Sequence, residues 1–329
     1  MLYLFDENRA LTTVIAEYES IITTRAFSEF STWTGRFPAE AYDALIAATY
    51  AVVADEDEVY LVECVTLNED ERTVTVDESR SALALLHDRT VEGTLEWSAT
   101  PLGEIISDLL ASLTGARALP LAFSSGLTAG DSVSLQVSWG DMGQTVLDLL
   151  ASGTLGIKCA MSGTDIAVTV FEPTAVDTLV GQVYGNASGG KIVRDERSWK
   201  NYAIVLGEGE GAARIRQDVD QTGSDALREL YVDARDLQQD ALSEAAYKLV
   251  LAQRGREKLA ETRVIEYAES STDAPLSVGD VPWYDSGRFS ATLMVSRSET
   301  TRESGTVKQG ATLGEPPPTL RRMIRRESR

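Results

Sequence analysis

The most conspicuous candidate for chemistry in this sequence is a run of alternating glycines and glutamates, Gly207-Glu-Gly-Glu-Gly211, which follows an apolar segment at 202–206. Exposed backbone N–H groups of such glycines can cradle an anion, so phosphate binding has to be considered. However, Glu208 and Glu210 would repel a phosphate, no Gly-Lys-Ser/Thr follows, and no apolar helix opens directly behind the run. The pattern therefore favours glycines that permit a bulge or close packing.

Two acidic runs, at 55–58 and 68–71, resemble metal-binding loops only superficially. The first reads Asp-Glu-Asp-Glu and the second Asn-Glu-Asp-Glu. Calcium loops between two helices need a glycine at the sharp turn and a bidentate glutamate at a fixed spacing, and neither run has this pattern. The sequence therefore predicts solvated hairpin tips, and it predicts no metal site and no cofactor.

Histidine and cysteine chemistry is limited because these residues are few. His87 is the single histidine, which excludes zinc sites with several histidines and leaves one candidate for a Ser-His or Cys-His pair. It precedes Asp88 and Arg89 at the predicted end of a short helix, so we expect it to pack at the surface or to place a charge at the helix C-terminus. Cys64 and Cys159 each lie in an apolar, strand-like run and are predicted to be buried free thiols.

Acidic residues are abundant, with 51 Asp and Glu in 329 residues. In such a chain some pair of carboxylates always lies near enough for glycoside hydrolysis, so abundance does not identify an active site. No Asp or Glu lies in an apolar, aromatic run of the sequence that would raise its pKa, as catalytic acids commonly require. We therefore predict that the protein is not an enzyme.

Charge is distributed unevenly along the chain. The formal net charge is −21, yet residues 321–329 carry +4, so residues 1–320 carry −25. An acidic body of this kind does not attract the phosphates of a nucleic acid. The basic end holds the candidate partner-binding residues, which are Arg321, Arg322, Arg325, Arg326 and Arg329.

The sequence has no apolar run that approaches the roughly 18 residues needed to span a bilayer. Asp6 and Glu7 stand where a signal peptide would have basic and apolar residues. With 43% hydrophobic residues the chain can form sizeable cores, and its length predicts two or three domains. We expect a soluble protein that is made in the cytoplasm and does not insert into a membrane.

Short strands separated by polar turns dominate the first predicted domain, residues 1–95. Residues 96–190 instead predict an inserted α+β domain with two helices, one beginning at Thr100-Pro101 and one covering about 141–151. Both helices contain Gly-x-x-x-x-Asp-Leu-Leu-Ala-Ser, at an offset of forty residues. An ancient duplication and convergent helix chemistry explain this repeat equally well.

Residues 191–315 return to strands and contain one long predicted helix, 241–261. Its expected inner stripe is formed by Ala245, Ala246, Leu249, Val250 and Leu259. Residues 316–329 begin with a run of prolines and continue into the arginine-rich end, with few residues able to form a core. We interpret this last segment as a flexible or partner-ordered peg.

Three groups of segments, taken in order, carry a family resemblance. The first group is Trp33-Thr-Gly-Arg-Phe37 with residues 59–65, 72–76 and 83–89; the second runs from Tyr202 through the glycine run to Asp236; the third is residues 276–281 with Arg297 and 310–314. In order and spacing they resemble the first barrel, the central signature and the closing barrel of the siphovirus tail hub proteins, which are also called tail-associated or baseplate-hub proteins. The resemblance covers most of residues 1–315.

The resemblance implies an α+β, mainly β, fold in which two small hub-type β-barrels flank the inserted α/β domain. The first barrel would be residues 1–95. The second would be residues 191–315, with the strands that flank 199–236 completing the barrel and the long helix packing alongside. Three identical copies would form a ring, in which two barrels per chain present six similar edges below a six-fold tail tube.

By the same resemblance, the protein would be a structural component of the virion tail tip that is assembled in the cytoplasm of the bacterial host and serves host attachment and DNA ejection. Its expected partners are its own copies, the distal tail protein, the tape measure protein, and tail fibre or receptor-binding proteins. DNA would pass the lumen without specific binding. The acidic residues would either line this lumen or form a solvated exterior that aids solubility. The arginine-rich peg would bind an acidic groove on a neighbour.

Two other functions stay open at this point. One is the hub of a contractile injection system or of a phage-derived particle, which shares the pair of barrels. The other is a carbohydrate-binding adhesion module, suggested by aromatic residues at Trp97, Trp139, Trp283 and Tyr284. Each of these tryptophans flanks a predicted strand or helix start, so core or interface packing is the preferred interpretation.

Overall fold

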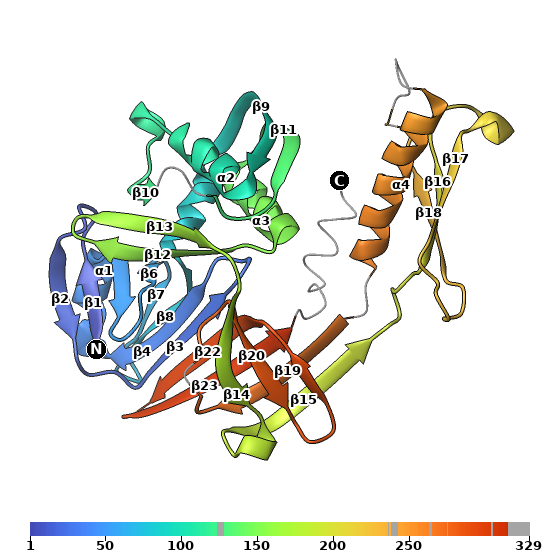
Figure 1. Ribbon diagram of the computed structural model, residues 1–329. Coiled ribbons are helices and arrows are strands. Elements are labelled where there is room, and N and C mark those ends of the chain that lie inside the picture. Colours follow the sequence, from blue (N-terminus) through green and yellow to red (C-terminus); the bar gives the residue numbers. More distant parts are fainter. Residues whose placement is uncertain are drawn as a thin grey trace. The chain divides into compact units, whose positions relative to one another are not determined.

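The computed structural model describes residues 1–123, 128–235, 237, 243–262, 265–274, 276–303 and 305–314 (Figure 1). Most of its regular structure is β-strand, accompanied by a few α-helices, which confirms the predicted α+β, mainly β, fold class. The described residues form two compact units. The larger comprises Met1–Lys191 and Ala268–Gly314, and the smaller comprises Ile192–Tyr267.

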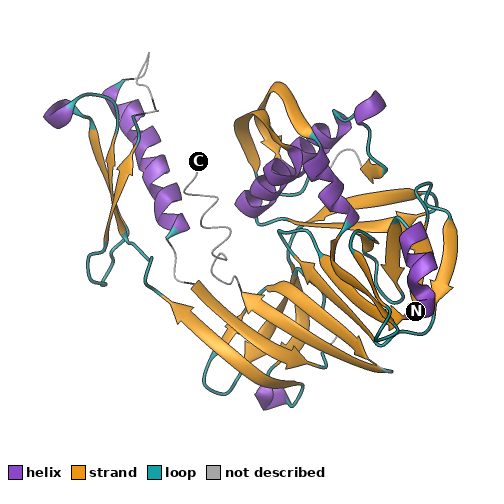
Figure 2. Cartoon of the chain, turned by 180° about the vertical axis from the view of Figure 1, so that it is seen from behind, coloured by secondary structure: helices purple, strands orange, loops and turns teal. Residues whose placement is uncertain are grey.

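An eight-stranded sheet is the largest element of the fold, and strands from both ends of the chain contribute to it (Figures 1 and 2). Its order is β15-β19-β23-β22-β3-β4-β8-β7. The sheet is continuous because β22 pairs with β3 in antiparallel register, from Arg297 opposite Ala26 to Glu303 opposite Ser20. The strands are β3 (Ser20–Ala26), β4 (Thr32–Pro38), β7 (Val65–Asn68), β8 (Thr73–Arg80), β15 (Ala187–Asp195), β19 (Ile265–Thr272), β22 (Val295–Glu303) and β23 (Thr306–Gly314).

One face of this sheet shares a core with a second sheet near the N-terminus. The second sheet has the order β2-β1-β5-β6, with β1 (Leu2–Phe5), β2 (Leu11–Ile15), β5 (Tyr50–Val53) and β6 (Val59–Leu61). Buried and less buried residues alternate along β3 and β4, so Ile21, Trp33 and Phe37 point into this core. The indole N–H of Trp33 donates to the carbonyl oxygen of Leu61 over 2.8 Å, which ties the two sheets together.

Two strand–helix pairs form the first half of the inserted segment. Strand β9 (Thr90–Pro101) runs directly into α2 (Leu102–Ala111), and β11 (Ser132–Asp141) runs directly into α3 (Met142–Gly153). The strands form an antiparallel ribbon in which Glu96 lies opposite Gln136. Their residue numbers differ by forty, which is also the offset between the two copies of the sequence motif. The two copies of the motif therefore occupy equivalent positions in the fold. The Asp141 carboxylate caps α3 by accepting the backbone N–H of Gln144 over 2.6 Å.

Two three-stranded sheets and several short helices complete the larger unit. The sheet β10-β13-β12 belongs to the inserted segment, and the sheet β14-β20-β21 combines a strand from its end with two strands from the C-terminal part. These strands are β10 (Leu121–Phe123), β12 (Gly156–Ser162), β13 (Asp165–Phe171), β14 (Thr174–Val180), β20 (Asp280–Asp285) and β21 (Ser290–Thr292). The short helices are η1 (Ala39–Ala41), α1 (Tyr42–Ala47), η2 (Ala82–Asp88), η3 (Gly115–Arg117) and η4 (Gln182–Tyr184).

The smaller unit is a three-stranded sheet with one helix on it (Figure 1). Strand β16 lies between β17 and β18, and α4 packs against one face of the sheet. The helix begins at the capping residue Ser243, whose hydroxyl accepts the N–H of Ala246 over 3.3 Å. The elements are β16 (Tyr202–Leu206), η5 (Gly211–Ala213), β17 (Arg216–Asp220), β18 (Glu229–Asp233) and α4 (Glu244–Glu261).

The packed stripe of α4 differs from the prediction. Among the predicted residues Leu259 is buried, whereas Leu249 and Val250 are 70% and 39% exposed. The stripe that packs on the sheet is Tyr247, Leu251, Gly255 and Leu259. Apolar periodicity fits two neighbouring faces of this helix, and the choice between them depends on the sheet: Tyr247 closes over Gly207, and Gly255 lets the helix approach Val205.

Strand pairing in the C-terminal half also differs from the prediction. The strands that flank residues 199–236 in sequence were expected to complete one barrel with that region, but β16, β17 and β18 pair with one another. The flanking strands belong to other sheets. β22 pairs with β3 along most of its length, and β23 and β19 follow β22 in the same eight-stranded sheet. Over the described residues none of the sheets closes on itself, so the assignment of two hub barrels stays a prediction.

Replacing Gly207 by alanine should destabilise the smaller unit. A Cβ at this position would lie 2.5 Å from the Tyr247 hydroxyl oxygen, which is fixed by the N–H of Glu208 at 2.9 Å and by the carbonyl of Leu237. We expect a loss of about 1–3 kcal/mol in the free energy of unfolding, as for other overpacked sites. Urea unfolding, with hydrogen exchange to follow β16, measures it. The matched control is Gly310→Ala, where a Cβ meets nothing within 4 Å; an equal loss in both variants would contradict this account.

Candidate functional site

The arginines predicted to bind a partner are Arg321, Arg322, Arg325, Arg326 and Arg329. They lie outside the described residues, as does the whole of the predicted peg at 316–329. Their role therefore stays a prediction. The sites that the structure does describe belong to the two compact units.

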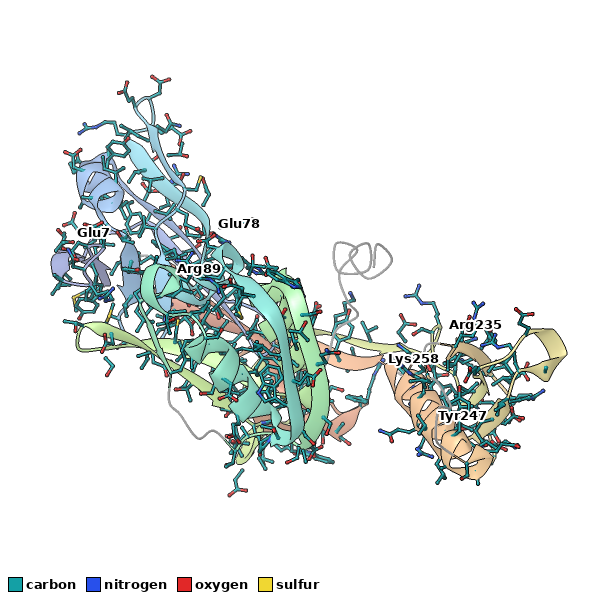
Figure 3. All side chains as sticks on the ribbon, turned by 90° about the horizontal axis from the view of Figure 1, so that it is seen from above. Glu7, Glu78, Arg89, Arg235, Tyr247 and Lys258 are labelled. Atoms are coloured by element: carbon teal, nitrogen blue, oxygen red, sulfur yellow. The ribbon has the colours of Figure 1, made fainter. Side chains whose placement is uncertain are left out.

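The glycine run at 207–211 is a tight turn against α4, in line with the packing role predicted for it (Figure 3 labels Tyr247 on the helix). The N–H of Gly207 donates to the carbonyl of Ile215 over 2.9 Å, and the N–H of Glu208 donates to the Tyr247 hydroxyl. Gly209 and Gly211 have φ of +117° and +53°, which favours glycine at both positions. Because the first N–H groups of the run are used within the protein, they are not available to cradle a phosphate.

The least expected site is a buried carboxylate, Glu58, whose side chain is 2% exposed. The Ser81 hydroxyl donates to its Oε1 over 2.6 Å, and the Cys159 thiol lies 3.5 Å from the same oxygen. A guanidinium nitrogen of Arg25 lies 3.8 Å from Oε2. The acidic run 55–58 was predicted to be a solvated hairpin tip, and this is wrong for Glu56 and Glu58, whose side chains are 6% and 2% exposed. Glu58 directly precedes the buried strand β6, so the chain is already entering the core at that point.

Burial raises the pKa of Glu58 to about 7, although the hydrogen bond from Ser81 and the charge of Arg25 act in the opposite direction. This corrects the expectation that no carboxylate has an environment that raises its pKa. A carboxyl that titrates near neutrality is suited to acid–base catalysis, but structural carboxylates buried among polar partners behave in the same way. Because Glu58 is closed off from solvent, we interpret it as a structural residue.

Glu56 and Asp57, next to Glu58, connect separate parts of the larger unit. Arg302 of β22 pairs with Glu56 over 2.8 Å, and the two side chains are 10% and 6% exposed. Glu56 also accepts the Thr23 hydroxyl of β3 over 2.6 Å. Asp57 pairs with Lys158 of β12 over 2.8 Å. Residues 56–58 therefore join the N-terminal sheet, the inserted segment and strand β22 through charged contacts.

His87 packs at the start of α3. Its Nδ1 lies 2.7 Å from Oδ1 of Asp141, and its ring meets the edge of Phe30 at a centroid distance of 5.3 Å. A Cβ on Gly143 would lie 2.6 Å from Nδ1, so the glycine makes room for the ring. These contacts give the histidine the packing role that was predicted for it.

The two cysteines have different environments. Cys159 is buried, as predicted, and Cys64 is exposed, which corrects the prediction of a second buried thiol. Residues 62–64 lie between β6 and β7 and belong to neither strand. The apolar run in the sequence therefore extends beyond the end of β6 at Leu61, and Cys64 lies in the part outside the sheet.

The aromatic residues considered for carbohydrate binding divide into packed and exposed ones. Tyr284 is 3% exposed, and Trp97 packs on the core of the inserted segment while its indole N–H donates to Asp108 over 3.0 Å. Trp139 and Trp283 are 68% and 41% exposed. The exposed pair lies on separate sheets, on β11 and β20, so the two rings do not belong to one sheet face.

The two end strands of the eight-stranded sheet are candidate assembly edges. Strands β15 and β7 each have a neighbour on one side only in the described sheet. An end strand presents a row of unpaired backbone N–H and C=O groups, which can pair with a strand of another chain. The larger unit thus has one such edge on a strand near the middle of the chain and one on a strand near the N-terminus.

In the described part of the chain, no three or more His, Cys, Asp or Glu side chains gather in an arrangement that could hold a metal ion. No helix in that part is long and apolar enough to cross a membrane.

The sequence comparison decides the family. The profile of the siphovirus ReqiPepy6 Gp37-like proteins matches residues 1–289. The chain belongs to this family. This confirms the resemblance to siphovirus tail proteins. No curated protein sequence matches the chain.

Solved structures of tail proteins share the fold of this siphovirus family member. The 43 kDa tail protein of prophage MuSo2 from Shewanella oneidensis matches with a TM-score of 0.62 at 13% identity, over 95% of this chain and 97% of that one. The prophage tail protein gp18 from Listeria monocytogenes matches with a TM-score of 0.62 at 10% identity, over 99% and 98%. A component of the type VI secretion system of E. coli, described as structurally similar to phage tail proteins, matches with a TM-score of 0.50 at 10% identity, over 97% and 80%. At these identities the likeness shows a common fold.

Replacing Glu58 by glutamine should flatten the pH dependence of stability. Because the folded-state pKa is raised above its ordinary value, the folded chain holds this proton more tightly than the unfolded chain does. The resulting stabilisation is complete below about pH 4.5 and is lost as pH rises through about 7, a total of about 3 kcal/mol. Glu58→Gln should lack this loss when unfolding is measured from pH 4.5 to 8. The exposed Glu69→Gln is the control, and parallel curves for Glu58→Gln and the wild type would rule this out.

Proposed function

We infer that this protein is a structural hub at the distal tip of a phage tail, where three copies form a ring between the tail tube and the tip. Two findings support the proposal: the chain belongs to a siphovirus family, and nearly its whole length shares a fold with phage tail proteins. The ring, its position and its three-fold symmetry go beyond these findings and belong to the proposal.

The observation that carries the proposal is the composition of the eight-stranded sheet. Four neighbouring strands, β3, β4, β8 and β7, come from residues 20–80, and the other four, β22, β23, β19 and β15, come from residues 187–314 in the second half of the chain. One chain therefore presents two successive four-stranded sets. Three chains would present six sets, which is the number needed to match a six-fold tube with a three-fold ring.

The open ends of this sheet suggest how such a ring closes. If β7 of one copy pairs with β15 of the next, the contact is head-to-tail, and three copies leave no free edge. Backbone pairing makes few demands on side chains, so it fits a fold that this chain shares with tail proteins at 10–13% sequence identity. The closed ring would surround a passage for DNA.

The partners follow from this position. We propose that the ring contacts the distal tail protein, the tape measure protein, and tail fibre or receptor-binding proteins, and that the peg at 316–329 binds an acidic groove on one of them. Assembly would take place in the cytoplasm of the bacterial host before the tail tip joins the virion. We expect no catalytic activity, because among the described residues the carboxyl whose pKa is raised to about 7, that of Glu58, is buried as a structural group.

A second candidate is the hub of a contractile injection system or of a phage-derived particle. The observation in its favour is that one protein with this fold is a component of a type VI secretion system. The two candidates differ in the particle, not in the chain. Negative-stain images of the native particle separate them, because a contractile system has a sheath around its tube.

The purified full-length chain should be a trimer, and an edge-blocking variant should be a monomer. Val65→Pro places a proline at the first residue of the end strand β7. The backbone N–H of Val65 points away from β8, because the hydrogen bond from Asp77 to Cys64 fixes which residues of β7 face β8, so the proline blocks the free edge and spares the pairing with β8. Light scattering and native mass spectrometry measure the mass. The control, Thr292→Pro, changes a residue of β21 whose N–H also points away from its partner strand, at the end of a different sheet, and should stay trimeric. A trimeric Val65→Pro variant would argue against ring closure through β7.

Deleting residues 316–329 should leave the fold and the trimer intact but weaken recruitment of a tail partner. The segment carries the five arginines, which can pair with carboxylates of a neighbour. Circular dichroism and the thermal midpoint report the fold, and the composition of assembled particles reports recruitment. A variant with the five arginines changed to glutamine keeps the length of the segment and should reproduce the deletion. Particles of unchanged composition would refute the role of the peg.

A further inference from the structure

One face of the eight-stranded sheet is open and rich in threonine, and we call it the threonine face. On β3, β4 and β8 it is the face opposite to the buried Ile21, Trp33 and Val76, as the strand registers require. Its threonine side chains are exposed or half-exposed, and the half-buried Ile22 and the buried Ala26 also lie on it. The threonines of this face are Thr24, Thr32, Thr34, Thr66, Thr75, Thr301, Thr306 and Thr312.

Three arginines stand among these threonines, and each lies on a different strand. Arg36 of β4 lies opposite Thr75, Arg80 of β8 lies opposite Thr32, and Arg297 of β22 lies opposite Thr312. Their side chains are 44%, 43% and 48% exposed, so solvent and solutes reach them. Without partners, three such guanidinium groups would form a patch that binds phosphate groups.

Every one of these arginines is paired with a glutamate that comes from outside the strands of the sheet. Arg36 pairs with Glu19 at 2.6 Å and with Glu71 at 3.1 Å. Arg80 pairs with Glu63 at 2.5 Å, and Arg297 pairs with Glu29 at 2.9 Å. Glu19 precedes β3 and Glu29 follows it. Glu63 precedes β7, and Glu71 lies in the turn between β7 and β8. The pairing is therefore supplied by loops at the borders of the sheet.

Stability does not explain this repeated arrangement well, because exposed ion pairs contribute little to folding. The pairs do change the charge of the face. Each guanidinium that faces a carboxylate is neutralised, and Glu299 and Glu303 on the same face add further negative charge against Lys308. The face as a whole is polar and, among the residues just named, slightly acidic.

We propose that Glu19, Glu29, Glu63 and Glu71 act as neutralising partners that keep the threonine face from binding a polyanion, namely double-stranded DNA. This inference rests on the proposed function, because a tail ring has DNA passing close to its inner wall. Short hydroxyl side chains give that wall hydrogen-bonding groups without charge, and the glutamates occupy the arginines that phosphate would otherwise take. The arginines thus contribute to the surface without holding the DNA.

The test compares two full-length variants with the same net charge. The first changes Glu19, Glu29, Glu63 and Glu71 to glutamine. The control changes four other exposed glutamates to glutamine. These are Glu7, Glu17, Glu69 and Glu210, and none of them lies on a strand of the threonine face. Fluorescence anisotropy with a labelled DNA duplex at low salt measures binding.

The first variant should bind DNA on the order of tenfold more tightly than the control, with a log–log salt slope steeper by about 2.7, which is about 0.9 for each of three phosphates. Adding Arg36→Ala, Arg80→Ala and Arg297→Ala to it should abolish this gain, because the gain is assigned to the freed guanidinium groups. Equal DNA affinity of the two four-site variants, or a gain that survives loss of the arginines, would overturn the proposal.

The same samples distinguish this inference from the proposed function. Light scattering gives the oligomeric state of each variant without reference to DNA. A gain in DNA binding by a monomeric chain would support the role of the glutamates and count against the ring. A trimer that shows no gain would support the ring and refute the role of the glutamates.

Discussion

The pairing of β22 with β3 is the constraint on which the larger unit depends. It joins residues near the C-terminal end of the described chain to residues near the N-terminus in one antiparallel register. Without it the eight-stranded sheet would separate into two parts, and the strands β19 and β23 would lose their link to the N-terminal core. Such long-range contacts form late and carry a high loop-closure cost, so they need stabilisation beyond the ladder itself.

Charged side chains at the junction make the position of β22 specific, because each buried charge requires its partner. Arg302 of β22 forms an ion pair with Glu56, and Glu56 also accepts a hydrogen bond from the hydroxyl of Thr23 in β3. An unpaired buried charge at this place would be costly, so correct docking of β22 is coupled to correct placement of the loop at 55–58. Glu58, in the same loop, is the residue where burial exceeds the compensation, which is why burial raises its pKa.

The outer surfaces suggest how a protein of this family serves assembly. The ends of the sheet are left open on β7 and β15, where another chain can add a strand. The threonine face, in contrast, has every arginine matched with a glutamate. Self-association through backbone edges and low adhesion through a neutralised face are compatible within one sheet, because they use different directions of the same strands.

Much of this protein was determined by local sequence alone. The alternation of apolar residues predicted the strands, the two helices of the inserted segment follow their predicted starts, and the glycines at 207–211 serve the close packing expected of them. The strands and the helix starts depend on neighbours a few residues away, and the turn at 207–211 depends on the backbone freedom of Gly209 and Gly211. Family membership also followed from the order of short motifs, because such motifs are local.

Tertiary structure decided the features that depend on distant partners. Which face of α4 is buried depends on Gly207 and Val205 in another element, and the burial of Glu58 depends on Ser81 and Cys159. The exposure of Cys64 depends on where the chain leaves its sheet, and the sheet order depends on β22 meeting β3. Periodicity and composition specify what a segment can form, whereas burial and strand order are properties of pairs of segments. For that reason a single stretch of sequence does not contain them.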